Sequence, residues 1–329
     1  MMIKDNIKIE KRCANMINIR KVAIIGCGFV GSSIAFSLMQ RGLFSEMVLI
    51  DSNQEKAEGE AMDLGDGLPY TASMDIYAGR YDDIADCALV IITAGANQKP
   101  GETRLDLIDK NVAILKTIIP EIKKRNFEGI LMIVSNPVDV LTYAAYKISG
   151  FPAHRVIGSG TVLDTARLKQ LLGEYLRVDA RSVHAFIVGE HGDSELAVWS
   201  SANVSGIDLD HFCEIRGESN HENSMENLYE IVRDSAYEII KRKGATYYGI
   251  AMAVARISES IVKDEHSVLP ISVVLEGEYG LKGLSLSIPS IVGKNGLETI
   301  LEIPLSKKEN DALAASAKQL EQVIQKIHF

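Results

Sequence analysis

Residues 21–31 read KVAIIGCGFVG, an apolar run that leads directly into a G-x-G-x-x-G pattern. The run has the length of a buried strand, and residues 32–41 then carry apolar side chains at helical spacing. The first glycine of such a pattern permits a tight turn, the second lets a pyrophosphate approach the backbone, and the third packs helix against strand. In this strand, turn and helix context the pattern predicts a dinucleotide site at the start of the helix.

A second feature of the same site is Asp51, which ends the next apolar run twenty residues after Gly31. An acidic side chain at this spacing can accept hydrogen bonds from the adenine ribose hydroxyls, and it repels a 2′-phosphate. Asp at the end of a strand is also typical of an ordinary turn. Together with the glycines it predicts NAD rather than NADP as the cofactor.

The first half of the chain alternates short apolar runs with helical patterns. This alternation predicts an α/β domain with a Rossmann-type, doubly wound parallel sheet. Two loops that follow apolar runs, at residues 93–96 and 134–137, fall at the carboxyl ends of strands, where such sheets bind ligands. The expected strands are 21–26, 47–51, 89–93 and 130–134, and the expected helices include 58–64 and 105–125.

From about residue 150 the pattern changes to mixed strands and longer helices, which predicts a second, α+β catalytic domain. We expect strands at 185–188 and at 284–292, the latter despite Pro289, and helices at 225–243 and 309–328. The predicted division is an N-terminal extension over 1–20, an NAD-binding domain over 21–150 and a substrate domain over 151–329. Residues 1–20 are either a loosely ordered arm, most of which a start at Met16 would remove, or an arm that contacts another subunit.

Composition excludes several classes of protein. The 329 residues are 47% hydrophobic and 24% charged, typical of a folded domain rather than a disordered one. A net charge of -9 argues against a nucleic-acid binder, which needs a basic face. The four cysteines form no C-x-x-C pair, so we expect neither a metal site nor a disulfide framework. With no apolar run of membrane length and no signal-peptide core in the first residues, we expect no membrane contact and a cytoplasmic location.

Five segments resemble the lactate and malate dehydrogenase superfamily, in order and spacing, along the chain from Lys21 to about Ile327. They are GCGFVG at 26–31, AGANQKPGETRLDL at 94–107, SNPVDVLT at 135–142, GSGTVLDTARLK at 158–169 and GEHGDSE at 189–195. The resemblance implies a hydride exchange between NAD and a small 2-hydroxy acid.

Such a reaction takes up or releases a proton at the substrate oxygen, so it needs a group that titrates near neutral pH. His191 lies in the GEHGD motif, and the resemblance pairs it with Asp164, which should orient the imidazole and favour its cationic form. Arg167, three residues after Asp164, can bind the substrate carboxylate with its planar fork. By resemblance, Arg104 closes over the substrate and polarises its carbonyl. Outside these motifs each residue would be read as structural or as a solvated surface charge.

The resemblance also assigns binding residues. Asn136 donates to the substrate oxygen, and Thr246 lines the substrate pocket. Lys56, Tyr81 and Asn111 are cofactor contacts on resemblance alone. The complete predicted cofactor set is Gly26, Gly28, Phe29, Val30, Gly31, Asp51, Lys56, Tyr81, Gly95, Ala96, Asn111, Val134, Ser135 and Asn136.

The substrate depends on Gln98, at the position where malate enzymes of the superfamily carry Arg. A neutral amide cannot neutralise a second carboxylate, and leaving a buried carboxylate poorly paired costs roughly several kcal/mol. We therefore expect pyruvate and L-lactate, with malate or other, longer 2-hydroxy acids as the alternatives. A non-catalytic nucleotide sensor is a further alternative, against which the intact His191, Asp164, Arg167 and Arg104 argue.

Regulation and assembly are expected from the resemblance alone. Relatives associate as dimers of dimers, so we expect a homotetramer. In bacterial-type enzymes an Arg and a His bind fructose 1,6-bisphosphate as an allosteric activator, and here Lys169 and His184 occupy those positions. Lys keeps the charge but lacks the bidentate geometry of Arg, so activation is a hypothesis. The implied role is the fermentation of pyruvate to lactate after glycolysis.

Overall fold

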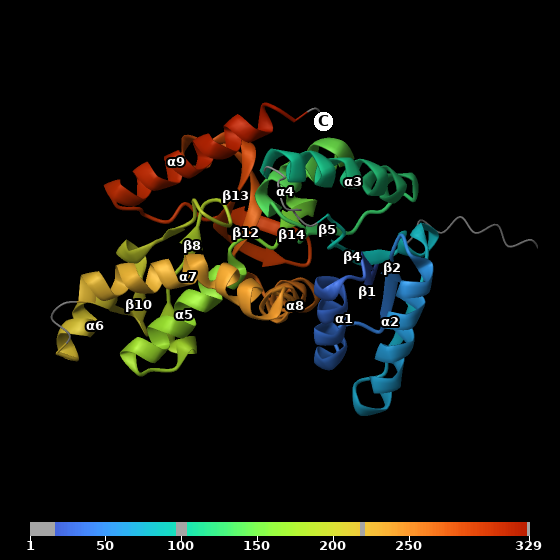
Figure 1. The fold of residues 1–329 in the computed structure, drawn as a ribbon, viewed down its shortest axis with the longest axis horizontal. Helices are drawn as coiled ribbons and strands as arrows, with labels where there is room; N and C mark the ends of the chain where they lie inside the picture. The colour runs from blue at the N-terminus through green and yellow to red at the C-terminus, as the bar shows by residue number, and fades with distance from the viewer. Residues whose placement is uncertain (1–16, 97–103, 218–220, 328–329) are drawn as a thin grey trace, which may run out of the picture.

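A nine-stranded sheet runs through the molecule, in the order β14-β13-β12-β6-β5-β4-β1-β2-β3 (Figure 1). The computed structural model describes residues 17–96, 104–217 and 221–327, apart from the side chains of residues 104, 221 and 222. Within these ranges no helix is long and apolar enough to cross a lipid bilayer.

The parallel half of the sheet confirms the predicted doubly wound fold, because strands β3-β2-β1-β4-β5-β6 are all parallel to their neighbours. Its central strands are buried on both faces, as β4 shows along its whole length, which explains why their sequences are continuously apolar. The strands are β1 (Asn18–Ile25), β2 (Glu46–Ile50), β3 (Asp75–Ala78), β4 (Cys87–Ile92), β5 (Ile130–Ile133) and β6 (Val156–Gly158).

Helices cover both faces of these strands. Figure 1 shows α1 and α2 below the parallel strands and α3 and α4 above them. The helices are α1 (Phe29–Arg41), α2 (Gln54–Gly67), α3 (Arg104–Lys124) and α4 (Val138–Ser149), with 3₁₀ helices η1 (Leu68–Tyr70), η2 (Tyr81–Ile84) and η3 (Ala153–Arg155). Because these strands are parallel, the loops that follow β1, β2, β4 and β5 all lie at the carboxyl ends of the strands, along one side of the sheet.

The sheet continues into the second half of the chain through antiparallel strands. Strand β12 (Ser267–Glu276) pairs with β6 at Ser272 and Gly158, and β13 (Lys282–Gly293) and β14 (Gly296–Ile300) follow it. The predicted strand around Pro289 is thus present. The last parallel strand, β6, lies after residue 150, where the sequence predicted the domain boundary. The position of that boundary stays a prediction.

The remaining elements surround this extension. The strand expected at 185–188 is shorter, because β8 covers only Ile187–Val188 and residues 185 and 186 connect it to β7. The last helix begins at a capping box of Ser306 and Glu309 and ends at Ile324, four residues before the predicted end. The elements are α5 (Val162–Leu176), η4 (Ala180–Ser182), β7 (Val183–His184), β8, β9 (Leu196–Ala197), η5 (Trp199–Ser201), β10 (Asn203–Val204), β11 (Ile207–Asp208), α6 (Leu209–Ile215), α7 (His221–Lys243), α8 (Tyr248–Lys263), η6 (Glu278–Gly280) and α9 (Lys307–Ile324).

Candidate functional site

The glycine-rich loop between β1 and α1 has the geometry that a dinucleotide site requires. Gly26 has a φ of +104°, and a Cβ on Gly31 would stand 1.9 Å from the carbonyl oxygen of Gly26. Neither position can therefore carry a larger side chain without a backbone shift. A Cβ on Gly28 would meet nothing within 4 Å, so this backbone faces open space where a pyrophosphate can approach. Phe29 and Val30 begin α1, and the Phe29 ring stacks on Tyr247 at 5.4 Å between centroids.

Asp51 directly follows β2 and lies against this loop. Its Oδ2 accepts a hydrogen bond from the backbone N–H of Cys27 at 2.7 Å, and its Oδ1 accepts from the N–H of Asn53 at 2.9 Å. Burial alone raises the pKa of Asp51, but these two N–H groups hold it below the ordinary value. Asp51 is therefore an anion, as ribose recognition requires, and it also holds the glycine loop against β2.

The loops after β4 and β5 are joined by Asn111, which projects from α3. The buried amide accepts from the N–H of Ala96 at 2.7 Å and donates to the carbonyl of Asn136 at 2.7 Å. The hydroxyl of Ser135 donates to the carbonyl of Ala94, also at 2.7 Å. The structure thus brings the predicted residues Gly95, Ala96, Val134, Ser135 and Asn136 into one wall, with Asn111 as the link between the two loops.

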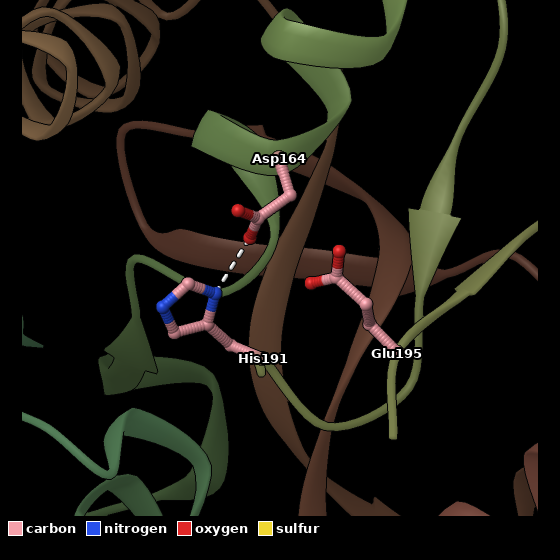
Figure 2. A group of neighbouring side chains, drawn as sticks. All are labelled: Asp164, His191 and Glu195. Carbon is pink, nitrogen blue, oxygen red and sulfur yellow. Dashed lines mark hydrogen bonds and ion pairs between the residues drawn. The ribbon is translucent and has the colours of Figure 1, made fainter. Parts of the chain in front are cut away.

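The predicted histidine and aspartate form a pair (Figure 2). Nδ1 of His191 lies 2.6 Å from Oδ2 of Asp164, which is 2% exposed in the first turn of α5. Burial lowers the pKa of His191, but the charge and hydrogen bond of Asp164 outweigh it and raise the pKa to about 9. The imidazole is therefore cationic at neutral pH, and Nε2 is left for a substrate.

Arg167 completes a chain of charges through the same aspartate. Its Nη1 lies 2.8 Å from Oδ1 of Asp164, so the one carboxylate contacts both the histidine and the arginine. Despite burial, which raises it, the pKa of Asp164 is held below its ordinary value by His191 and Arg167. Arg104 begins α3, but its side chain and the whole of Gln98 lie outside the described residues.

Asp139 holds the loop that carries His191, and sequence reasoning gave it no role. Its Oδ2 accepts from the backbone N–H of His191 at 2.7 Å, and its Oδ1 accepts from the hydroxyl of Ser287 at 3.1 Å. Two backbone hydrogen bonds between Gly189 and Ser287 fasten the same loop to β13. Asp139 lies in the SNPVD segment, three residues after Asn136, so its position in that motif was the available signal.

Glu195 is the second group without an assigned role in the sequence. It ends the GEHGDSE segment immediately before β9, is 4% exposed, and points its carboxyl toward the pair formed by Asp164 and His191 (Figure 2). A ring nitrogen of His191 and one carboxyl oxygen of each acid lie within 4.8 Å of one another. Burial, followed by the charge of Asp164, raises the pKa of Glu195 to about 8.

The other predicted residues lie on neighbouring elements. Thr246 and Arg167 both line a cavity of about 360 Å³ between α5, α7 and α8. Lys56 is in the first turn of α2, and Tyr81 begins η2 with its ring 5.8 Å from the guanidinium of Arg125. The two candidate activator residues belong to elements that pack together, Lys169 to α5 and His184 to β7.

Comparison with known proteins identifies this arrangement. Residues 20–158 match the family model of the lactate/malate dehydrogenase NAD binding domain, and residues 161–328 match that of the lactate/malate dehydrogenase alpha/beta C-terminal domain. The chain belongs to the lactate/malate dehydrogenase family. Membership confirms the resemblance seen in the sequence and the prediction of NAD as cofactor. The open backbone at Gly28 and the charged Asp51 fit that cofactor.

Three proteins similar to this chain are L-lactate dehydrogenases. The chain is 54% identical over 306 residues to an L-lactate dehydrogenase of Acetivibrio thermocellus, covering 93% of this chain and 96% of the relative. It is 52% identical over 303 residues to an L-lactate dehydrogenase of Priestia megaterium, covering 92% and 95%. The crystal structure of a minor L-lactate dehydrogenase from Enterococcus mundtii in a ligands-bound form superposes with a TM-score of 0.92 at 45% identity, covering 94% and 99%.

Proposed function

We propose that this chain is an NAD-dependent L-lactate dehydrogenase, which interconverts pyruvate plus NADH with L-lactate plus NAD. The observation that carries the proposal is Asp164, which binds the imidazole of His191 at 2.6 Å and the guanidinium of Arg167 at 2.8 Å. A proton donor and a carboxylate-binding group are thereby held side by side. The similar proteins described above are L-lactate dehydrogenases, which supports the same substrate pair.

His191 would supply the proton in this reaction. When bound, NADH supplies a hydride to the carbonyl carbon of pyruvate, and the carbonyl oxygen then needs a proton. Because Nδ1 is bonded to Asp164, Nε2 is the atom that donates in this direction and accepts in the reverse direction. The raised pKa of His191, about 9, keeps the donor charged at neutral pH.

Three further groups would bind and polarise the substrate. Arg167 pairs with the carboxylate of pyruvate, because its guanidinium is partly buried and already oriented by Asp164. Arg104 and Asn136 would stabilise the negative charge that develops on the carbonyl oxygen. Thr246 and Gln98 would complete the pocket, with the neutral Gln98 discriminating against a second carboxylate.

The cofactor would lie along the edge formed by the glycine loop, Asp51 and the wall built around Asn111. Its pyrophosphate fits the open backbone at Gly28 and the start of α1. The ribose hydroxyls would bond to Asp51, with Lys56 and Tyr81 as further contacts.

The test compares NADH oxidation with pyruvate and with oxaloacetate, for the purified chain and for Gln98→Arg. We expect a strong preference for pyruvate that moves toward oxaloacetate in the variant, because the new charge pairs the second carboxylate. Gln325→Arg adds the same charge at an exposed position after α9 and should change neither rate. A wild-type preference for oxaloacetate would make the protein a malate dehydrogenase, and no turnover of either would support a nucleotide sensor.

Assembly, location and regulation complete the proposal. We propose a cytoplasmic homotetramer, on the family resemblance, with fructose 1,6-bisphosphate bound near Lys169 and His184. Packing of α5 on β7 places their elements together, and Lys169 supplies the cationic charge that a phosphate requires. Pyruvate saturation curves that are unchanged by the bisphosphate at both acidic and neutral pH would reject the activator site.

A further inference from the structure

Glu195 is a buried acid whose hydrogen-bonding capacity is almost unused. Among the described residues, Oε1 has no hydrogen-bond partner, and Oε2 accepts only a long bond of 3.5 Å from the N–H of Gly192. The residue is nevertheless held firmly, because its backbone carbonyl accepts from the hydroxyl of Tyr229 on α7. Its position therefore comes from the backbone and not from its carboxyl group.

A carboxyl group in this position is unfavourable as an anion. Burial removes water from it, and a carboxylate oxygen of Asp164 lies within 4.8 Å. The negative charge is more stable on Asp164 than on Glu195, since Asp164 accepts hydrogen bonds from both His191 and Arg167. When two neighbouring acids compete in this way, the one with fewer donors keeps its proton. Glu195 is accordingly neutral at neutral pH, and its pKa of about 8 agrees with this.

Glu195 lies where its charge would act on the histidine. Figure 2 shows Glu195 on the opposite side of His191 from Nε2, so Glu195 does not block the nitrogen that is left for the substrate. The other ionisable groups near Glu195 are Asp164 and Arg167 on α5 and Tyr229 on α7, while Asp139 on α4 acts on His191. The contacts of Asp164 hold its pKa below the ordinary value, and burial raises the pKa of Asp139 and raises that of Tyr229 to about 12. Glu195 and His191, with pKa values of about 8 and about 9, are therefore the groups expected to change charge between pH 7 and 9.

We propose that Glu195 is a positioning residue that becomes negatively charged in the alkaline range and thereby holds the proton on His191. This rests on the proposed function and extends it to the control of proton affinity. As pH rises, Glu195 first releases its proton to solvent. The resulting carboxylate then stabilises the imidazolium cation, so pyruvate reduction continues to a higher pH than the pair of Asp164 and His191 would allow alone.

The test is the pH profile of kcat/KM for pyruvate at saturating NADH, for the wild type and for Glu195→Gln. Gln has the same shape as the neutral acid, so at pH 6 the two profiles should agree within about threefold. The alkaline limb of the variant should move about one pH unit toward acid, from a screened charge about 5 Å away. Glu195→Asp, which restores a carboxyl group, should move the limb back toward the wild-type position.

The matched control is Asp193→Asn, which removes an exposed carboxylate from the same loop and should leave the limb unmoved, because solvent screens its charge. A purely structural role for Glu195 would lower kcat/KM equally at every pH, without a shift of the limb. An unmoved limb in Glu195→Gln, or a wild-type enzyme inactivated by EDTA, would overturn the proposal. No turnover by the wild type would instead refute the proposed function.

A second measurement does not depend on turnover or on the folding of a variant. Infrared difference spectra of the wild-type protein should contain the C=O band of a protonated carboxylic acid at pH 7 that disappears by about pH 9. The absence of such a band at pH 7 would show that Glu195 is already ionised, and would also overturn the proposal.

Discussion

The substitution Asp164→Asn tests how much of the proton affinity of His191 comes from one neighbour. The histidine has a pKa of about 9 against an ordinary value of 6.5. That difference corresponds to about 3 kcal/mol, at roughly 1.4 kcal/mol per unit. Burial opposes the shift, and the charges of Glu195 and Asp139 raise the pKa less than Asp164 does, so without the Asp164 carboxylate the pKa should fall to about 6.5.

The expected loss of activity follows from the protonated fraction. At pH 8 about nine tenths of the wild-type imidazole is cationic, against roughly one thirtieth in the variant, by the same pKa arithmetic. We therefore expect kcat/KM for pyruvate to fall about thirtyfold or more at pH 8. Part of this loss should be recovered at pH 5.5, where the imidazole of the variant is again protonated.

The assay is NADH oxidation under saturating cofactor from pH 5 to 10. Asp179→Asn is a suitable control, because Asp179 is an exposed acid that pairs with Arg181 beyond the other end of α5. It should leave the profile unchanged. An alkaline limb that stays near pH 9 in Asp164→Asn would refute the reasoning, since another group would then be holding the proton.

Three further predictions concern the cofactor site and stability. Gly28→Ala should keep the wild-type urea midpoint but weaken NADH binding measured by fluorescence. Gly31→Ala should lower the urea midpoint, since its Cβ collides with backbone. Equal urea midpoints for the two variants would contradict this prediction. Asn111→Leu leaves two loop groups without partners, and should cost about 2 kcal/mol and raise the Kd for NADH; an unchanged Kd would argue against the link. Glu195 and His191 bind protons more tightly in the folded than in the unfolded protein, so their contribution to the free energy of unfolding is complete at low pH and should be lost as pH rises toward 8 and 9. The urea midpoint should therefore fall less steeply with pH in Glu195→Gln, which lacks one of these groups.

Much of the nucleotide half was predictable because its signals are local. The apolar run before Gly26 and the helical spacing after Gly31 are properties of neighbouring residues, and they correctly predicted strand, turn and helix. Pairing of His191 with Asp164 was expected from motif resemblance, and the 2.6 Å contact between them agrees. The predicted strand at 185–188 was too long, because residues 185 and 186 connect β7, in one small sheet, to β8, in another, and only Ile187–Val188 form a strand.

The roles of Asp139 and Glu195 were not predictable in the same way. Asp139 accepts from the backbone N–H of His191, which is 52 residues away in the sequence. This contact forms only when the His191 loop is folded against α4, so no local pattern in the sequence predicts it. Glu195 stands in a segment whose importance was evident, yet its motif does not indicate that one carboxyl oxygen is buried without a partner.

The sequence by itself determined the fold class and the cofactor, because hydrophobic periodicity and glycine spacing are local properties of the chain. The reacting groups were predicted from the resemblance of its motifs to the family. Tertiary structure alone decided the charge states, because a pKa depends on all the groups and solvent that surround an atom. Three features arise from contacts between distant segments: the joining of both halves through β6 and β12, the attachment of the His191 loop to Asp139, and the raised pKa of Glu195.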